Sequence, residues 1–436
     1  MALSPLDSPL WQDLFGSETA RSTLSDHALI AAMVRVEIAL AEACEARGLV
    51  PEGCGTRIAE ALTDIAVDPA DLARGAARDG VPVPALLQVL RAHLEPSVAD
   101  ALHWGATSQD IVDTATIICL REFAAQLGAA CETVLDTLAA LAADEADTVM
   151  LARTRTQAAV PTTFGAIAAD WGAGLYDAAS RLQGIAAGLT DLSLHGAAGT
   201  DGALGPEADA VRAEMARRLG LTTTPAPWHR RRHALTDVAE ASAGLAAQAG
   251  RIGADLAYLA GSGIGEVRLS GGGSSAMPHK VNPVRAEAAQ SLARFAAHLL
   301  GAVAESAIHV SQRDGAAWGL EWLSLRPLCG ASAAALENVQ QALAGLETDR
   351  DAMLCNLRAA GSGPFSERLS YLLAAHMPRS AARQIVGHAL GTADPMSLLM
   401  ADYPQIDWAD AMDPLAAAGH APQQARAFAA SRGQQA

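Results

Sequence analysis

The chain has 436 residues, half of them hydrophobic and 4% aromatic, with a formal net charge of −17. This acidic balance argues against nucleic acid as a partner, because binding it relies on basic patches that neutralise phosphates. An anionic substrate is also repelled at long range, so its site must gather Arg and Lys locally.

The N-terminal part predicts small helices. Residues 1–15 lack the basic and apolar regions of a signal peptide. Residues 24–48 predict an amphipathic helix that ends at Gly48, because hydrophobic residues recur at helical spacing. They are Leu29, Met33, Val36 and Leu40. Prolines and glycines then interrupt residues 51–84, which predicts short helices and loops.

Long Ala- and Leu-rich stretches follow, and they predict a helical bundle about 40 Å or more in length at 1.5 Å per residue. The stretches are 107–146, 161–190, 233–260, 283–311 and 327–347. Alternating β-branched residues are almost absent, so we expect little sheet. The predicted fold class is all-α, with a central long-helix bundle at 107–347 between small helical domains at 1–106 and 348–436.

The cysteines and the hydropathy indicate a cytoplasmic protein. No cysteine belongs to a CxxC pair, and a chain of this length does not need disulfides for stability. We therefore expect reduced, mostly buried thiols. No uninterrupted apolar stretch reaches 18 residues, so no membrane span is expected. The low content of charged residues, 18%, favours an oligomer.

The segment 270–283, which reads SGGGSSAMPHKVNP, lies between two predicted long helices. The triple glycine indicates a mobile loop. It is not a Walker phosphate loop, because Lys280 lacks the preceding Gly and the following Ser or Thr. A flexible linker is the simpler alternative, but a linker does not require two serines, a lysine and an Asn-Pro helix start.

The string GSSAMPHKVNP resembles the signature loop of the fumarase/aspartase superfamily. The resemblance places the proposed catalytic serine of that family at Ser274, its loop lysine at Lys280 and its loop asparagine at Asn282. Ser275 and Met277 of the same loop join the expected substrate contacts. These enzymes remove a proton next to a carboxylate, and glycine-rich backbone, a lysine and a helix N-terminus can stabilise the charge that develops.

The segment HWGATSQDIVDT at 103–114 precedes a long helix. Thr107 and Asp110 have the spacing of a capping box, so a well-formed helix start explains them without any function. The same groups can bind a carboxylate. The segment resembles that of the carboxymuconate-lactonising branch, which implies that Thr107, Ser108 and Gln109 bind a substrate carboxylate and that His103 takes part in catalysis.

Residues 154–157 read Thr-Arg-Thr-Gln, where most of the superfamily has Thr-His-x-Gln. The family histidine protonates the leaving group, and Arg155 cannot do so because it stays protonated. Lactonisation needs no such acid, because its reverse expels a stable carboxylate. Arg155 is therefore expected to bind a substrate carboxylate, together with Gln157. A solvated arginine on a helix turn is the alternative.

Three weaker signals lie further along the chain. Arg313 matches a family arginine and is expected near the substrate. His229 and His233 are four residues apart, but no third ligand accompanies them, so neither a metal nor another cofactor is expected. Arg232 and its neighbours suggest a basic rim that attracts an acidic substrate.

The resemblance covers residues 20–360 and implies a homotetramer whose active sites combine segments of three chains. It implies a small di- or tricarboxylate substrate and, in the lactonising branch, cyclisation of 3-carboxy-cis,cis-muconate in aromatic catabolism. Two alternatives remain open. One is a lyase acting on adenylosuccinate or another succinyl compound, and the other is a non-catalytic structural homologue.

Overall fold

A computed structural model describes residues 3–273 and 276–433. The chain forms two compact units, and each combines three separate stretches of sequence. Unit 1 contains residues 1–130, 178–247 and 291–337. Unit 2 contains residues 131–177, 248–290 and 338–436. The three-domain division expected from the sequence stays a prediction.

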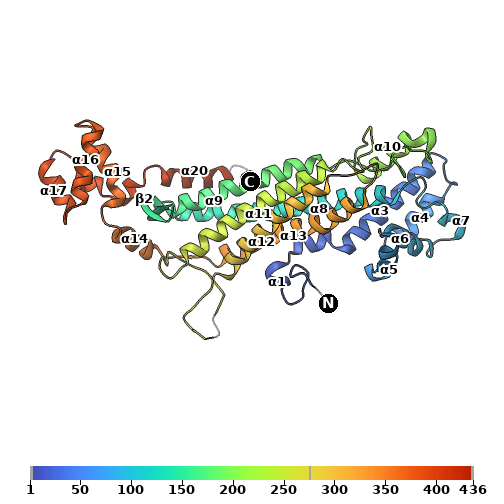
Figure 1. Cartoon of the computed structure of the whole chain (residues 1–436), viewed down its shortest axis with the longest axis horizontal. Helices are drawn as coiled ribbons and strands as arrows, with labels where there is room; N and C mark the ends of the chain where they lie inside the picture. Colours follow the sequence, from blue (N-terminus) through green and yellow to red (C-terminus); the bar gives the residue numbers. More distant parts are fainter. Residues whose placement is uncertain (1–2, 274–275, 434–436) are drawn as a thin grey trace. The chain divides into compact units, whose positions relative to one another are not determined.

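The N-terminal part of unit 1 is built from short helices around one longer helix, α3 (Figure 1). The helices are α1 (Gln12–Phe15), α2 (Glu18–Leu24), α3 (Asp26–Ala46), α4 (Cys54–Leu62), α5 (Pro69–Asp79), α6 (Val83–Arg91) and α7 (Pro96–Ala99). The side chain of Ser25 accepts a hydrogen bond from the Ala28 backbone N–H and so caps α3. Helix α3 lies within the predicted range 24–48, which confirms the interpretation from hydrophobic spacing.

The long helices occupy the predicted stretches. They are α8 (Ser108–Asp144), α9 (Phe164–Gly188), α11 (His233–Leu259), α12 (Val284–Ser306) and α13 (Gly315–Ala344). The predicted start of α13 at residue 327 was wrong, because the helix continues through Pro327. A proline inside a helix costs about 3 kcal/mol. Burial of Leu325 and Leu328 on either side offsets this cost.

Within unit 1, the parts of α8, α9, α11, α12 and α13 lie side by side (Figure 1). Small residues bring α11 and α13 together, where Ser242 Oγ lies 4.0 Å from Cys329 Sγ and both residues are buried. Ile111, Leu120 and Phe123 of α8 are buried in the same core. The bundle therefore forms a rigid support for the start of α8.

Unit 2 contains a β-hairpin that the sequence did not predict. Strands β1 (Val149–Thr154) and β2 (Gln157–Thr163) pair antiparallel, so residues 161–163 belong to a strand and the predicted helix begins at Phe164. A second short pair joins β3 (Val267–Arg268) to β4 (Glu347–Thr348). Behind the hairpin, Trp171 is fully buried, and its indole donates to Asp255 at 2.7 Å.

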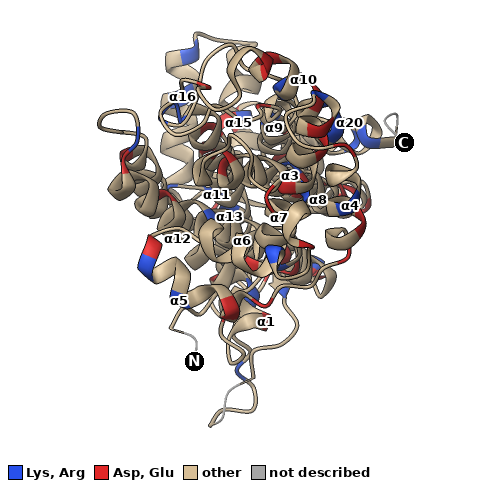
Figure 2. Ribbon diagram, turned by 90° about the vertical axis from the view of Figure 1, so that its right-hand side faces the viewer, with Lys and Arg blue, Asp and Glu red and all other residues tan. Residues whose placement is uncertain are grey.

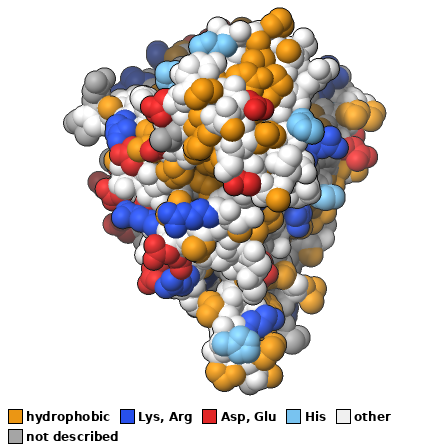
Figure 3. All heavy atoms as spheres, turned by 90° about the vertical axis from the view of Figure 1, so that its left-hand side faces the viewer, with side chains coloured by type: hydrophobic (Ala, Val, Ile, Leu, Met, Phe, Trp, Pro, Cys, Tyr) orange, Lys and Arg blue, Asp and Glu red, His pale blue; other side chains and the backbone are white. Residues whose placement is uncertain are grey.

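The remaining helices are short. They are η1 (Gly205–Glu207) and α10 (Ala208–Leu219) in unit 1, and α14 (Arg350–Ala359), η2 (Gly363–Phe365), α15 (Ser366–Ala374), α16 (Arg379–Leu390), α17 (Pro395–Asp402), α18 (Trp408–Ala411), α19 (Pro414–Ala417) and α20 (Ala421–Gly433) in unit 2. Around α15 and α16 a separate core forms, with Leu369, Leu373 and Val386 buried. Figure 3 shows hydrophobic groups on the surface at the side where α15, α16 and α17 lie in Figure 1. Tyr371 and Met400 of these helices are exposed.

Charged residues lie mainly on the outside of the helices. Acidic and basic residues are interspersed over α4, α7 and α10, as Figure 2 shows. Among the described residues, none of the helices is both long and apolar enough to cross a membrane.

Candidate active site

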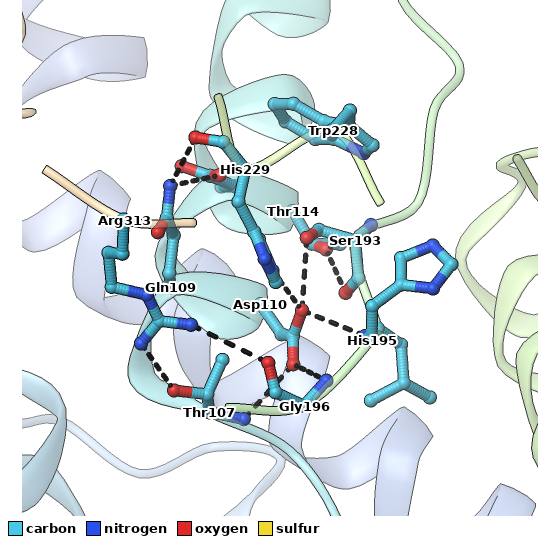
Figure 4. A network of polar contacts seen from close by, with 12 residues as sticks. Thr107, Gln109, Asp110, Thr114, Ser193, His195, Gly196, Trp228, His229 and Arg313 are labelled. Carbon is cyan, nitrogen blue, oxygen red and sulfur yellow. Dashed lines mark hydrogen bonds and ion pairs between the residues drawn. The ribbon is translucent and has the colours of Figure 1, made fainter. Parts of the chain in front are cut away.

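The start of α8 is organised by Asp110, whose side chain is fully buried (Figure 4). Its carboxylate receives hydrogen bonds from three separate segments. The donors are the backbone N–H groups of Thr107, His195 and Gly196, the Ser193 hydroxyl and the His229 ring, the last at 2.7 Å. Burial raises the pKa of Asp110, but these donors outweigh burial and lower it overall. Asp110 is therefore ionised, and it ties the three segments together.

Half of the predicted capping box is present, because the Thr107 N–H donates to Asp110 Oδ2 at 3.0 Å, whereas the Asp110 N–H donates to the Thr107 backbone carbonyl and not to its hydroxyl. The Thr107 hydroxyl is not used for capping. It accepts from Arg313 Nη1 at 2.8 Å, and Arg313 Nη2 lies 3.5 Å from the Gly196 carbonyl oxygen. Thr107 therefore precedes α8 and also contacts the segment between α12 and α13 that carries Arg313.

Arg313 is partly buried and pairs with no carboxylate within the described part of the chain. Its Nε is buried and has no hydrogen-bond partner among those residues. The first N–H groups of α8, a 37-residue helix, lie beside this guanidinium. An uncompensated guanidinium next to a helix N-terminus is a site for an anion, and Thr107 and Ser108 are partly exposed there.

Gln109 plays a different part from the expected one. Its side chain is buried, and its amide nitrogen donates to the His229 carbonyl oxygen at 2.8 Å and to Asp113 Oδ2 at 3.1 Å. Both acceptors are oxygens, so both amide N–H groups are occupied. Gln109 therefore has no donor left for a substrate carboxylate, and it supports the loop that carries His229.

The run Arg230–His233 differs from the predicted basic rim. Arg232 is buried between two acids, at 2.7 Å from Asp113 Oδ2 and 2.6 Å from Glu321 Oε1. His229 lies in the loop before α11, which begins at His233, so the two histidines do not share a helix face. No group of metal-ligand side chains occurs among the described residues.

His103 adopts a left-handed backbone with φ of +62° and contacts a residue that sequence reasoning missed. Its Nδ1 lies 2.7 Å from Oε1 of Glu37, a fully buried residue of α3. The sequence signal for this pair was an acidic residue on the apolar face of the helix at 24–48.

Arg155 and Thr156 form the tip of the β1–β2 hairpin, not a helix turn. Thr154 pairs with Gln157, and the two residues between them have φ of +51° and +67°. Such turns favour Asn-Gly, because side chains with a Cβ are strained at positive φ. Strain of this kind persists at functional sites. The tip presents Arg155 and Gln157 as exposed side chains.

The glycine-rich loop between α11 and α12 is closed at its base by backbone contacts (yellow in Figure 1). Gly273 forms an antiparallel bridge with Val281, and the Asn282 N–H donates to the Gly272 carbonyl oxygen at 2.8 Å. Lys280 and Met277 are exposed. Helix α12 begins at Val284, so the predicted Asn282 cap lies just before it. Ser274 and Ser275 lie outside the described residues.

Replacing Gly272 by Ala is expected to break the backbone contacts that close the glycine-rich loop. Gly272 has φ of +78°, and a Cβ there would lie 2.0 Å from the Asn282 carbonyl oxygen. We expect a loss of activity of about 10- to 100-fold with little change in thermal stability, because the strain of about 1–2 kcal/mol falls on a surface loop. Gly263→Ala is the control, since no atom lies within 4 Å of a Cβ there. Equal activity of Gly272→Ala and wild type would show that activity does not depend on these loop-closing contacts.

The expected site residues fall into two groups. His103, Thr107, Ser108 and Arg313 gather at the start of α8 in unit 1, whereas the hairpin tip and the glycine-rich loop belong to unit 2. Each group presents cationic side chains that no described carboxylate neutralises, namely Arg313 in unit 1 and Arg155 and Lys280 in unit 2.

A count of basic residues adds weight to Lys280. The chain has 31 Lys and Arg residues, and Lys280 is the sole lysine among them. Wherever a positive charge alone is required, this sequence uses arginine. The one lysine is therefore expected at a position that favours a compact ammonium over a planar guanidinium.

Comparison with known proteins identifies the family of the chain. A family model described as "Lyase" matches residues 12–297. The 3-carboxy-cis,cis-muconate cycloisomerase of Bradyrhizobium diazoefficiens is 34% identical over 392 residues, 88% of this chain and 86% of that protein. The nitrosuccinate lyase of Streptomyces davaonensis is 35% identical over 403 residues, covering 88% of this chain and 84% of that protein.

A solved structure extends the likeness to the whole fold. The 3-carboxy-cis,cis-muconate lactonizing enzyme from Pseudomonas putida aligns with a TM-score of 0.90 and 28% identity, over 98% of this chain and 99% of that one. The all-α fold class expected from the sequence is thereby confirmed. The chain belongs to the lyase family of the fumarase/aspartase superfamily and is an enzyme of that superfamily.

Proposed function

We propose that the protein is a 3-carboxy-cis,cis-muconate cycloisomerase, which closes that triacid to 4-carboxymuconolactone in aromatic catabolism. The observation that carries this proposal is Arg155 at the tip of a strained hairpin, at the position of the family's proton-donating histidine. An arginine binds a carboxylate well and supplies no proton, and cyclisation of a carboxylate needs no acid for a leaving group.

The substrate at neutral pH is a trianion, and the chain provides separate cations for it despite its net charge of −17. Arg313 and the α8 N-terminus provide one binding region, and Arg155 and Lys280 provide the others. His103 adds a further polar contact beside Thr107. Fixing the attacking carboxylate against the diene turns the reaction into a well-oriented intramolecular step, which is the main advantage that binding can supply.

In the reaction, an oxygen of one carboxylate forms a bond to a diene carbon. The electron pair of that double bond moves to the neighbouring carbon, next to a second carboxylate, and gives an enediolate. This carbon then takes up one proton, so a trianion becomes a dianionic lactone. Ser274 is the proposed proton donor, and Lys280, Asn282 and the start of α12 stabilise the enediolate. Ser275, Met277 and Gln157 complete the substrate contacts.

The assembly proposed is a cytoplasmic homotetramer whose active sites combine the Thr107, Arg155 and Ser274 regions of three chains. Exposed hydrophobic side chains on and between α12 and α13 support an interface there. They are Phe295, Ile308, Val310 and Leu323, which are 44%, 72%, 67% and 75% exposed. Hydrophobic groups at such exposure favour contact with another subunit.

A nitrosuccinate lyase activity is the second candidate. The 35% identity to the Streptomyces davaonensis protein supports it. Elimination from nitrosuccinate expels nitrite, which is a stable anion and, like a carboxylate, needs no protonation by residue 155. Arg155 is therefore compatible with both reactions.

The two candidates are separated by incubating the purified protein with each substrate. Loss of the diene ultraviolet absorbance reports cyclisation of 3-carboxy-cis,cis-muconate, and a colorimetric nitrite assay reports elimination from nitrosuccinate. We expect rapid loss of the diene and no nitrite. Nitrite release without diene loss would replace the first candidate by the second, and Ser274→Ala is expected to abolish either activity.

Replacing Arg155 by Gln is expected to lower kcat/KM for the triacid by about 10- to 100-fold, because a charge-assisted hydrogen bond contributes about 1.5–3 kcal/mol. Steady-state kinetics would measure it. Arg181→Gln, on the exposed side of α9, removes the same charge and serves as the control. If both variants behave alike, Arg155 does not bind substrate.

A further inference from the structure

Glu37 is an acidic residue buried in the hydrophobic face of α3. Its side chain is 0% exposed, and its neighbours along the helix, Met33, Val36 and Leu40, are fully buried. Burying a carboxylate is costly unless it is paired. Its Oε1 bonds to His103, whereas Oε2 is buried and has no partner among the described residues. A hydrophobic side chain would serve packing better, so the carboxylate indicates a role toward His103.

His103 is held in an unusual way. Its backbone is left-handed, at φ of +62°, a conformation that is strained for a residue other than glycine. Nδ1 is taken by Glu37, so Nε2 is the ring nitrogen available to a ligand, and the side chain is 17% exposed. Thr107, which accepts from Arg313, lies four residues further along. The charge of Asp110, in the first turn of α8, also acts on the His103 ring, so the ring lies near the anion site at the start of α8.

Charged groups from several elements face this ring. Glu37 comes from α3, Asp110 from α8 and Arg91 from α6, and the Cys44 thiol of α3 lies near Glu37. Burial lowers the pKa of His103, but the hydrogen bond and charge of Glu37, with a smaller contribution from Asp110, outweigh burial and raise it overall. The imidazolium is therefore present below this raised pKa and is lost as pH rises through it.

We propose that Glu37 is a positioning residue that holds His103 with its Nε2–H directed at a substrate carboxylate bound beside Thr107 and Arg313. The hydrogen bond to Glu37 fixes Nδ1 of His103, and the negative charge of Glu37 stabilises the imidazolium. The His103 ring therefore acts as a second cation of this anion site, beside Arg313. The nature of the carboxylate rests on the proposed function, but the Glu37–His103 pair does not depend on which di- or tricarboxylate is turned over.

The test measures binding of tricarballylate, an unreactive saturated tricarboxylate, by isothermal titration calorimetry from pH 6 to 9. Glu37→Gln keeps the size of the side chain and an acceptor for His103 but removes the charge. Glu42→Gln, the same change on the same helix at a residue paired with Arg218, is the control. Ratios of variant to wild-type dissociation constants cancel the ionisation of the ligand.

We expect the ratio for Glu37→Gln to rise with pH to about tenfold, the effect of losing one charge-assisted hydrogen bond, because removal of the Glu37 charge lowers the pKa of His103 and the variant loses its imidazolium at lower pH than wild type. Glu42→Gln should give a ratio near one throughout. A purely structural role of Glu37 predicts a ratio that does not change with pH, and that result would overturn the proposal, as would an unchanged affinity.

A second variant covers the case in which Glu37→Gln does not fold. His103→Gln leaves Glu37 in place, and it should remove the pH-dependent part of tricarballylate binding relative to wild type. If tricarballylate binding by His103→Gln keeps the pH dependence of wild type, His103 is not the group responsible and the proposal is refuted. A protein that turns over no triacid yet shows the pH-dependent ratio would refute the proposed substrate and leave the role of Glu37 intact, so the two failures are distinguishable.

Discussion

Lys280→Arg is expected to lose about 10²- to 10³-fold in kcat/KM, although it keeps the positive charge. The residue is the sole lysine among 31 basic residues, and it lies on a glycine-rich loop whose base is closed between Gly273 and Val281. An ammonium is a compact point charge that can approach an enediolate oxygen closely and can exchange a proton. The guanidinium is larger, planar and always protonated. Loss of one well-placed donor to a developing oxyanion costs about this much.

Steady-state kinetics of Lys280→Arg would be compared with those of Arg268→Lys. That control exchanges the same two residue types at an exposed position, which pairs with Asp349 on the surface of unit 2, and its kcat/KM should stay within about twofold of wild type. Retention of most activity in Lys280→Arg would show that charge alone suffices at position 280.

Asp110→Asn is expected to free the three segments that meet at the start of α8. The carboxylate accepts from the backbone N–H groups of His195 and Gly196 and pairs with His229 at 2.7 Å. An asparagine amide turns one acceptor oxygen into an NH2 group, which faces N–H donors. Leaving several buried N–H donors without their charged acceptor costs about 3 kcal/mol or more. Because the pKa of Asp110 lies below its usual value, the wild-type network is ionised at neutral pH.

Hydrogen exchange detected by mass spectrometry measures this effect locally. Peptides covering residues 193–196 should exchange at least about 10²-fold faster in Asp110→Asn, since 1.4 kcal/mol corresponds to tenfold. The matched control is Asp26→Asn, where the carboxylate is 67% exposed and pairs with Arg326. Unchanged exchange in residues 193–196 would mean that the hydrogen-bond network around residue 110 does not depend on the negative charge of Asp110.

The long helices could be predicted from the sequence because each has a long apolar stretch with clear ends. Residues 233–260, for example, became α11 (His233–Leu259). The hairpin at 149–163 could not, because its turn is Arg155-Thr156, where turn chemistry predicts Asn-Gly. The stretch predicted at 327–347 began too late, because α13 (Gly315–Ala344) continues through Pro327, where the neighbouring leucines are buried.

The site could be predicted only as far as local motifs reach. Motifs led to the expectation of Thr107, Arg313 and Arg155 at the site, but the direct contact between Arg313 and Thr107 joins residues about 200 positions apart and has no local signature. The same holds for Glu37, which is 66 positions from His103. Gln109 was assigned to the substrate because its motif suggested it, whereas burial turns its amide toward Asp113 and the His229 carbonyl.

The central claim, cyclisation of a triacid, is tested most directly by running the reaction in deuterium oxide and recording the product by proton and carbon NMR. Addition of a carboxylate to the diene requires one proton from the enzyme, so the account predicts 4-carboxymuconolactone with one deuterium at the carbon next to the carboxylate. Unchanged 3-carboxy-cis,cis-muconate after incubation with folded protein, or a product without a lactone ring, would contradict it.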